Sequence, residues 1–120
     1  MALNAELEGV LQRLRSAVPE IQGSLVASID GLVIASNTKG DANRMAAMIA
    51  TALGLGMRIC DTFSAGDLSE TSVTGNSGQI YVYSTGPKGV LAVYAVTGAN
   101  VGLINLECRD AAKKIAAIFG

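Results

Sequence analysis

Two runs of β-prone residues joined by Asp30 and Gly31 are the feature that most limits how this chain can fold. The first run extends from Gly23 to Ile29 and the second from Leu32 to Ser36. Asp-Gly is typical of the tight turn of an antiparallel hairpin, because both turn positions favour positive φ. Both runs are almost continuous in apolar or small residues, which predicts a sheet that is covered on both faces.

The rest of the chain predicts three helices and three more strands. Apolar residues at helical spacing place the helices at 3–17, at about 42–64 after an Asp41 cap, and from Asn100 to the end. The strands are expected at 70–74, 79–84 and 90–97, and the last is the most apolar and therefore central. The predicted order is α-β-β-α-β-β-β-α, an α+β sandwich with a five-stranded antiparallel sheet.

Length and composition favour one globular unit that associates with itself. The chain has 120 residues, which is enough for a single domain spanning 1–120 and not for two. Half of the residues are apolar and 16% are charged, which excludes disorder as the main state. A mean hydropathy of +0.41 is high for a small monomer, so we expect part of the apolar surface to be hidden by self-association.

Charge and hydropathy exclude several classes of partner. The net charge is −1 and the basic residues are scattered, which argues against nucleic acid binding. No apolar run is expected to be long enough for a membrane span, and the N-terminus lacks the basic region of a signal peptide. Cys60 and Cys108 are interpreted as two buried thiols in a reducing compartment, which predicts a cytoplasmic protein.

No motif in the chain predicts catalysis, a cofactor or a metal site. Histidine is absent, which removes the commonest general base and the commonest metal ligand. The Gly54-Leu55-Gly56 segment falls inside a helical pattern, so it is not a dinucleotide-binding loop. Two distant cysteines cannot form a metal site, and no pair of carboxylates is spaced for acid–base chemistry. We therefore expect no enzyme activity of its own, no catalytic residue and no cofactor.

The long middle helix divides into three strips on a helical wheel. The first strip is an ordinary apolar stripe that should face the sheet. It contains Met45, Ile49, Ala52, Gly56, Ile59 and Phe63, extended by Ala46, Leu53 and Cys60.

The second strip is small and mostly apolar: Asn43, Ala47, Ala50, Gly54, Met57 and Asp61. Gly54 inside a helix costs about 1 kcal/mol relative to Ala, which predicts a compensating close approach by another element. One interpretation is helix-on-helix packing across a dimer. The alternatives are packing on a loop of the same chain, or two glycines that merely loosen the helix.

The third strip mixes apolar residues with arginines: Arg44, Met48, Thr51, Leu55, Arg58 and Thr62. Exposed Met and Leu framed by Arg is typical of a protein-binding surface, and the alternative is a solvated face with incidental apolar residues. The strand at 70–74 is short and lacks charge after Glu70. At a sheet edge it would have few guards against pairing with another copy.

Three segments together resemble the Roadblock / dynein light chain family, whose bacterial and archaeal members include MglB-like regulators of small GTPases. The segments are the hairpin at 23–36, the Ala-rich middle helix, and the Asn-capped helix start from Ala99 to Leu106 that follows the most apolar strand. The resemblance implies a profilin-like sandwich, with the long helix on one face of the sheet and the terminal helices on the other.

The resemblance also implies homodimers in which the third strands pair into a ten-stranded sheet and the middle helices lie side by side. The residues that this assigns to the dimer interface are Ala47, Ala50, Gly54, Met57, Thr71 and Val73. Family members bind small Ras-like GTPases or serve as scaffolds. The implied partner surface is then Arg44, Met48, Thr51, Leu55 and Arg58 of two adjacent helices.

The function that this implies is a non-enzymatic homodimeric regulator of a small Ras-like GTPase in a prokaryotic cytoplasm. Such a regulator activates or otherwise modulates GTP hydrolysis by shifting the conformation of its partner. Arg44 or Arg58 as an arginine finger is a further hypothesis. The alternatives are a structural adaptor that leaves nucleotide turnover unchanged and a small-ligand sensor.

Overall fold

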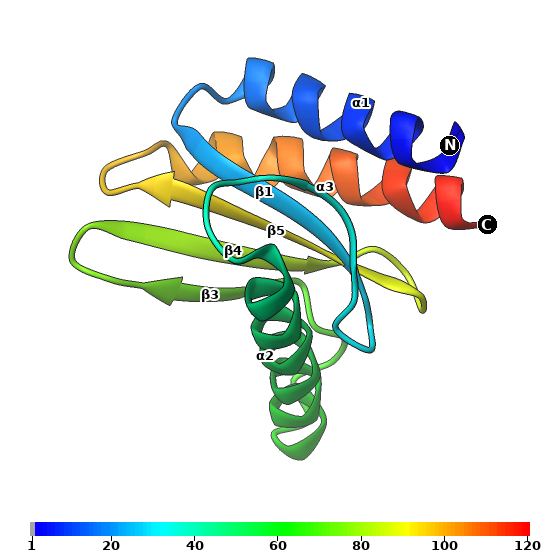
Figure 1. Ribbon diagram of the computed structural model, residues 1–120. Helices are drawn as coiled ribbons and strands as arrows, with labels where there is room; N and C mark the ends of the chain where they lie inside the picture. Colours follow the sequence, from blue (N-terminus) through cyan, green and yellow to red (C-terminus); the bar gives the residue numbers. More distant parts are fainter. Residues whose placement is uncertain (1) are drawn as a thin grey trace.

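The computed structural model describes residues 2–120, which form three helices and five strands in the predicted order (Figure 1). The helices are α1 (Ala2–Ala17), α2 (Ala42–Thr62) and α3 (Val101–Phe119). The strands are β1 (Ile21–Ser28), β2 (Val33–Asn37), β3 (Thr71–Thr74), β4 (Gly78–Ser84) and β5 (Gly89–Val96). Most predicted bounds agree with these within two residues.

The five strands form one antiparallel sheet in the order β2-β1-β5-β4-β3. The most apolar strand, β5, lies in the centre as predicted, and β2 and β3 form the two edges. Ala92 of β5 pairs with Leu25 of β1 on one side and with Val82 of β4 on the other. This register sets which residues of the sheet lie in one row.

The β1–β2 turn differs from the predicted two-residue turn. Ser28 N donates to Leu32 O at 2.9 Å, so three residues, Ile29 to Gly31, form the loop. Gly31 N donates to Ser28 O at 3.0 Å, and among the loop residues only Gly31 has a positive φ, at +91°. This arrangement is a tight turn followed by one left-handed glycine, which needs glycine at a single position.

Both faces of the sheet are covered, as the continuous apolar runs predict. Helices α1 and α3 lie side by side on one face and α2 lies on the other (Figure 1). Alternation along the strands supplies both cores. Tyr81, Tyr83, Leu91 and Val93 face α1 and α3, whereas Val82, Val90 and Ala92 face α2.

Side-chain caps begin α2 and α3 at the predicted residues. Asp41 Oδ1 accepts a hydrogen bond from Arg44 N at 3.1 Å, and Asn100 Oδ1 accepts one from Leu103 N at 3.0 Å. Each cap satisfies a first-turn N–H that has no partner inside the helix. The caps therefore fix where the exposed face of α2 begins.

The prediction that one stripe of α2 faces the sheet along its whole length is wrong for the second half of the helix. Ala46, Ile49 and Leu53 are buried, but Ile59 is 49% exposed and Phe63 is 78% exposed. The C-terminal end of α2 extends beyond β3 in Figure 1, so no strand of the same chain lies beneath it.

Helix α2 is also more apolar than the sequence argument allowed. The helix has 21 residues, and an 18-residue stretch of it reaches a mean hydropathy of 1.2, which is long and apolar enough to cross a membrane. Only 17% of that stretch is buried. One such helix is weak support for a span, since a helix that faces a core and a partner has the same composition. The exposed apolar side chains of α2 are therefore suited to contact with another protein or a second copy of the chain.

Candidate functional site

The most prominent exposed feature of α2 is the strip that points away from the sheet, hereafter the outward strip. Its members are Arg44, Met48, Thr51, Leu55 and Arg58, and all five are exposed. They lie on the side of the helix opposite the buried Ala46, Ile49 and Leu53. The structure thus brings the predicted partner-binding residues together on one surface.

Apolar side chains occupy the middle of the outward strip and arginines its two ends. Met48 is 61% exposed and Leu55 is 56% exposed. Within residues 2–120 neither Arg44 nor Arg58 forms an ion pair. The strip spans 14 residue steps at a rise of about 1.5 Å, or roughly 21 Å, which is long enough for a protein contact.

The glycine- and alanine-lined flank of α2 is partly covered by the chain itself. Its predicted interface residues are Ala47, Ala50, Gly54 and Met57. A Cβ on Gly31, in the β1–β2 turn, would lie 3.1 Å from Ala47 Cα. Nothing lies within 4 Å of a Cβ on Gly54, and Met57 is 50% exposed. The flank therefore contacts the turn at its first residue and is open farther along.

The helical glycine that needs its missing side chain is Gly56 rather than Gly54. A Cβ on Gly56 would lie 2.5 Å from Thr71 Oγ1 and 3.1 Å from Leu68 Cδ2. Gly56 thus lets α2 approach the start of β3 closely. This contact positions the end of the helix relative to the edge of the sheet.

Strand β3 carries the other two predicted interface residues, Thr71 and Val73. Within the described chain β3 pairs only with β4, so its outer backbone edge has no strand partner. Val73 is 54% exposed, and the buried Thr71 Oγ1 makes no hydrogen bond. An ion pair between Glu70 and Arg109 joins the residue before β3 to α3. The edge is therefore held in place from both faces of the sheet.

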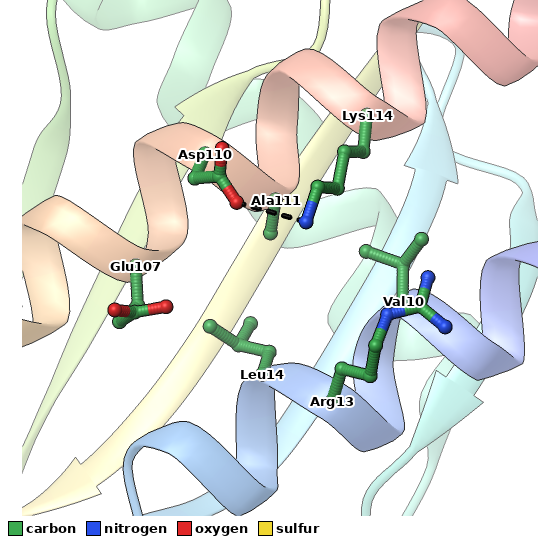
Figure 2. A pocket seen from close by; sticks show the side chains of 7 residues that line it. All are labelled: Val10, Arg13, Leu14, Glu107, Asp110, Ala111 and Lys114. Atoms are coloured by element: carbon green, nitrogen blue, oxygen red, sulfur yellow. Dashed lines mark ion pairs between the residues drawn. The ribbon is translucent and has the colours of Figure 1, made fainter.

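Two hollows on the surface of the described residues are too small or too open to suggest a ligand site. A cavity of about 40 Å³ lies between α1 and α3. Two acidic and two basic side chains line it (Figure 2). Its lining residues are Val10, Arg13, Leu14, Glu107, Asp110, Ala111 and Lys114. A second, shallow hollow of about 250 Å³ lies between α1 and β2. Ligand pockets usually measure about 300–1,000 Å³, so neither of these two hollows supports a small-ligand sensor.

Two buried ionisable groups are held in their neutral forms. Burial raises the pKa of the Cys108 thiol to about 12, against a smaller lowering by its hydrogen bond with Tyr83. Burial also raises the pKa of Tyr83 well above its usual range, and the Tyr83 hydroxyl donates to Asn105 Oδ1. Such a protonated thiol is a poor nucleophile. Residues 2–120 contain no cluster of three or more His, Cys, Asp or Glu able to hold a metal.

Sequence reasoning missed several exposed apolar side chains, at the end of α2 and on the sheet. They are Ile59 and Phe63 on the helix and Tyr94 on β5, which is 40% exposed. The length of the predicted helix could have revealed this exposure, because the helix is longer than the sheet is wide. Twenty-one residues span roughly 31 Å, whereas five strands span only about 19 Å, so a helix that crosses the sheet overhangs it.

The comparisons with known proteins agree on one family. The family model described as Roadblock/LC7 domain matches residues 7–95. An uncharacterized protein of Methanocaldococcus jannaschii is 38% identical over 101 residues, which cover 82% of this chain and 88% of that protein.

Solved structures share the fold. The first is MglB in a tetrameric arrangement, with a TM-score of 0.89 at 18% identity, over 98% of this chain and 90% of that one. The second is a Roadblock/LC7 domain from Streptomyces avermitilis, with a TM-score of 0.82 at 25% identity, over 97% and 96% of the two chains. The likeness to MglB, at this identity, shows the fold alone.

Proposed function

This chain belongs to the Roadblock/LC7 domain family, and from that premise we propose that it is a non-enzymatic, homodimeric regulator of a small Ras-like GTPase. We propose further that residues 1–120 act as one such domain in the cytoplasm, where GTPases and GTP are found. The outward strip of α2 is the partner surface in this proposal.

The observation that carries the proposal is the composition and placement of the outward strip. Met48 and Leu55 are more than half exposed at its centre, and Arg44 and Arg58 frame them. Apolar anchors bounded by arginine are typical of protein interfaces, where arginine is enriched and lysine is depleted. The two guanidinium groups favour an acidic patch on the partner.

Two copies would double this surface. The free edge of β3 and the overhanging end of α2 both favour self-association, because each leaves groups that a second copy could satisfy. An isologous pair would bring two outward strips onto one platform. The tetrameric arrangement of MglB supports assembly of this fold into oligomers.

The proposed mechanism is a population shift in the GTPase. A regulator without a catalytic residue accelerates hydrolysis only if it binds the hydrolysis-competent conformation more tightly than the others. A tenfold rate increase needs about 1.4 kcal/mol of such preference, which one buried apolar anchor can supply. An arginine finger from Arg44 or Arg58 would give a much larger effect, of about 10³-fold or more.

Single-turnover hydrolysis and nucleotide exchange test the proposal. A Ras-like GTPase from the same organism, loaded with GTP, would be measured with and without this chain. We expect the rate of hydrolysis or the rate of exchange to change severalfold when this chain is present. The Arg44→Ala and Arg58→Ala variants then show whether either guanidinium group causes that change. A complex that forms while both rates stay unchanged would contradict regulation.

That last result defines the second candidate, a structural adaptor whose dimer holds partner proteins together. The two free surfaces that favour it are the same ones, since the outward strip and the sheet edge can bind proteins without any effect on turnover. Binding with unchanged hydrolysis and exchange would therefore establish the adaptor.

A further inference from the structure

The β1–β2 turn carries two large apolar side chains that are mostly exposed, and we call residues 29–32 the hairpin tip. Ile29 is 53% exposed and Leu32 is 69% exposed. The geometry of the turn requires neither of them. A turn of this kind favours serine at its first position and glycine at its fourth, and Ser28 and Gly31 occupy those positions. The two apolar side chains therefore point to a role outside the turn.

Hydrogen bonds hold the hairpin tip in one conformation. Besides the bonds that close the turn, Leu32 N donates to Ser28 Oγ at 3.1 Å. Ile29 N donates to Lys88 O at 3.3 Å, which ties the tip to the turn between β4 and β5. A segment that is ordered before it binds loses little conformational freedom on binding, so its contacts contribute more fully to affinity. The tip is therefore suited to present its apolar side chains to a partner.

The hairpin tip lies against α2 and borders the outward strip (Figure 1). A Cβ on Gly31 would lie 3.1 Å from the Cα of Ala47. Ala47 is exposed and lies about 100° around the helix from the buried Ala46, so the tip reaches past the side of α2. Ala47 follows Arg44 by three residues and precedes Thr51 by four, which makes it a surface neighbour of both. The tip and the outward strip thus form one continuous surface.

The charges around the hairpin tip favour the same kind of partner as the outward strip. Lys88 and Arg44 are both exposed, and neither forms an ion pair in the part of the chain that the structure describes. The tip itself carries one carboxylate, Asp30. Apolar side chains with two free cations beside them fit a partner whose exposed apolar patch has an acidic rim.

We propose that the hairpin tip is a second contact element for the GTPase, in which Ile29 and Leu32 bind an apolar patch beside the one that the outward strip binds. The inference rests on the proposed function and extends its surface to a segment outside α2. The end of α2 and the edge of β3, which favour self-association, take no part in this contact.

A double substitution at the hairpin tip tests the proposal. Ile29→Ser with Leu32→Ser removes both apolar side chains and leaves the hydrogen-bonded turn residues in place. Val101→Ser with Leu106→Ser is the matched control, since both residues are exposed on α3, on the other face of the sheet. Titration calorimetry measures the affinity of each variant for a Ras-like GTPase from the same organism, loaded with a non-hydrolysable GTP analogue.

We expect the dissociation constant to rise at least tenfold for the tip variant and less than twofold for the control, because loss of a buried apolar anchor weakens an interface strongly. Equal constants for the two variants would overturn the inference. If Leu55→Glu still weakened binding in that case, the proposed function would stand without the tip. A wild-type chain that binds no GTPase would overturn the proposed function together with this inference.

Protection from labelling distinguishes direct contact from an indirect effect on folding. In a Cys60→Ser background, Leu32→Cys places a reactive thiol on the tip and Leu106→Cys places one on α3, while Cys108 stays buried. Saturating GTPase should slow the reaction of a polyethylene glycol maleimide with Leu32→Cys at least fivefold and leave its reaction with Leu106→Cys unchanged. An unchanged rate at Leu32→Cys in the complex would overturn the inference, even if the double tip variant bound weakly.

Discussion

Adding one methyl group at Gly56 should destabilise this fold, whereas adding it at Gly54 should stabilise it. Both glycines lie inside α2, where alanine is favoured over glycine by about 1 kcal/mol. At Gly54 a new Cβ meets nothing within 4 Å, so the full gain is expected. At Gly56 it would lie 2.5 Å from Thr71 Oγ1, and overpacking of this kind costs about 1–3 kcal/mol.

The free energies of unfolding of the two variants should therefore differ by about 1–3 kcal/mol, with Gly56→Ala the less stable. A chain of 120 residues has an unfolding entropy of roughly 0.25 kcal/mol/K, so each kcal/mol shifts Tm by about 4 °C. Urea unfolding followed by circular dichroism, at one protomer concentration, measures the difference. Equal concentrations matter because association alters apparent stability.

A double-mutant cycle identifies the cause. Thr71→Ala removes the oxygen that the new methyl group would meet, so the double variant should recover most of the loss at Gly56. If Gly54→Ala and Gly56→Ala shift stability equally, or if Thr71→Ala gives no recovery, α2 does not approach β3 through Gly56 and the reasoning fails.

Two further predictions concern the N-terminal cap of α3 and the buried thiol of Cys108. Asn100→Ala removes the cap on Leu103 N and should lower the free energy of unfolding by about 1 kcal/mol, measured by thermal unfolding; no change would mean that the cap is dispensable. Stability should also fall as pH rises above the ordinary thiol pKa of 9.0, because the unfolded chain then releases a proton that the folded Cys108, with a pKa of about 12, retains. This group contributes a slope of about 1.4 kcal/mol per pH unit between those two values, and Cys108→Ala should flatten it in urea titrations at pH 8 and pH 10.5. An unchanged slope in that variant would assign the alkaline loss to another group.

Local signals in the sequence were sufficient for the layers and the order of the elements. Continuous apolar runs predicted a sheet covered on both faces, and the most apolar strand is indeed the central one. Asp41 and Asn100 begin their helices as expected, because capping depends on a few neighbouring residues. The five residues of the outward strip also share one exposed surface, and their binding role stays a prediction.

Long-range geometry explains what the sequence missed. Helical periodicity shows which face of α2 is apolar, but it does not show where the sheet beneath that face ends. The periodicity therefore predicted Ile59 and Phe63 to be in the core, but both are exposed in the structure. Gly56 looked like one more residue of the core stripe, because its contact with Thr71 joins segments that are far apart in the chain. The interface roles of Ala47, Ala50, Gly54 and Met57 stay a prediction.

The central claim is that the outward strip of α2 binds the GTPase. The most direct test is to substitute one residue of that strip and to measure the affinity of the variant for the GTPase. Leu55→Glu places a charge at the centre of the outward strip, and Leu106→Glu places the same charge on α3, on the opposite face. Titration calorimetry with the GTPase loaded with a non-hydrolysable GTP analogue should show at least tenfold weaker binding for Leu55→Glu and unchanged binding for Leu106→Glu. Equal affinities for the two variants, or loss of binding only in Leu106→Glu, would contradict the claim that the outward strip of α2 binds the GTPase.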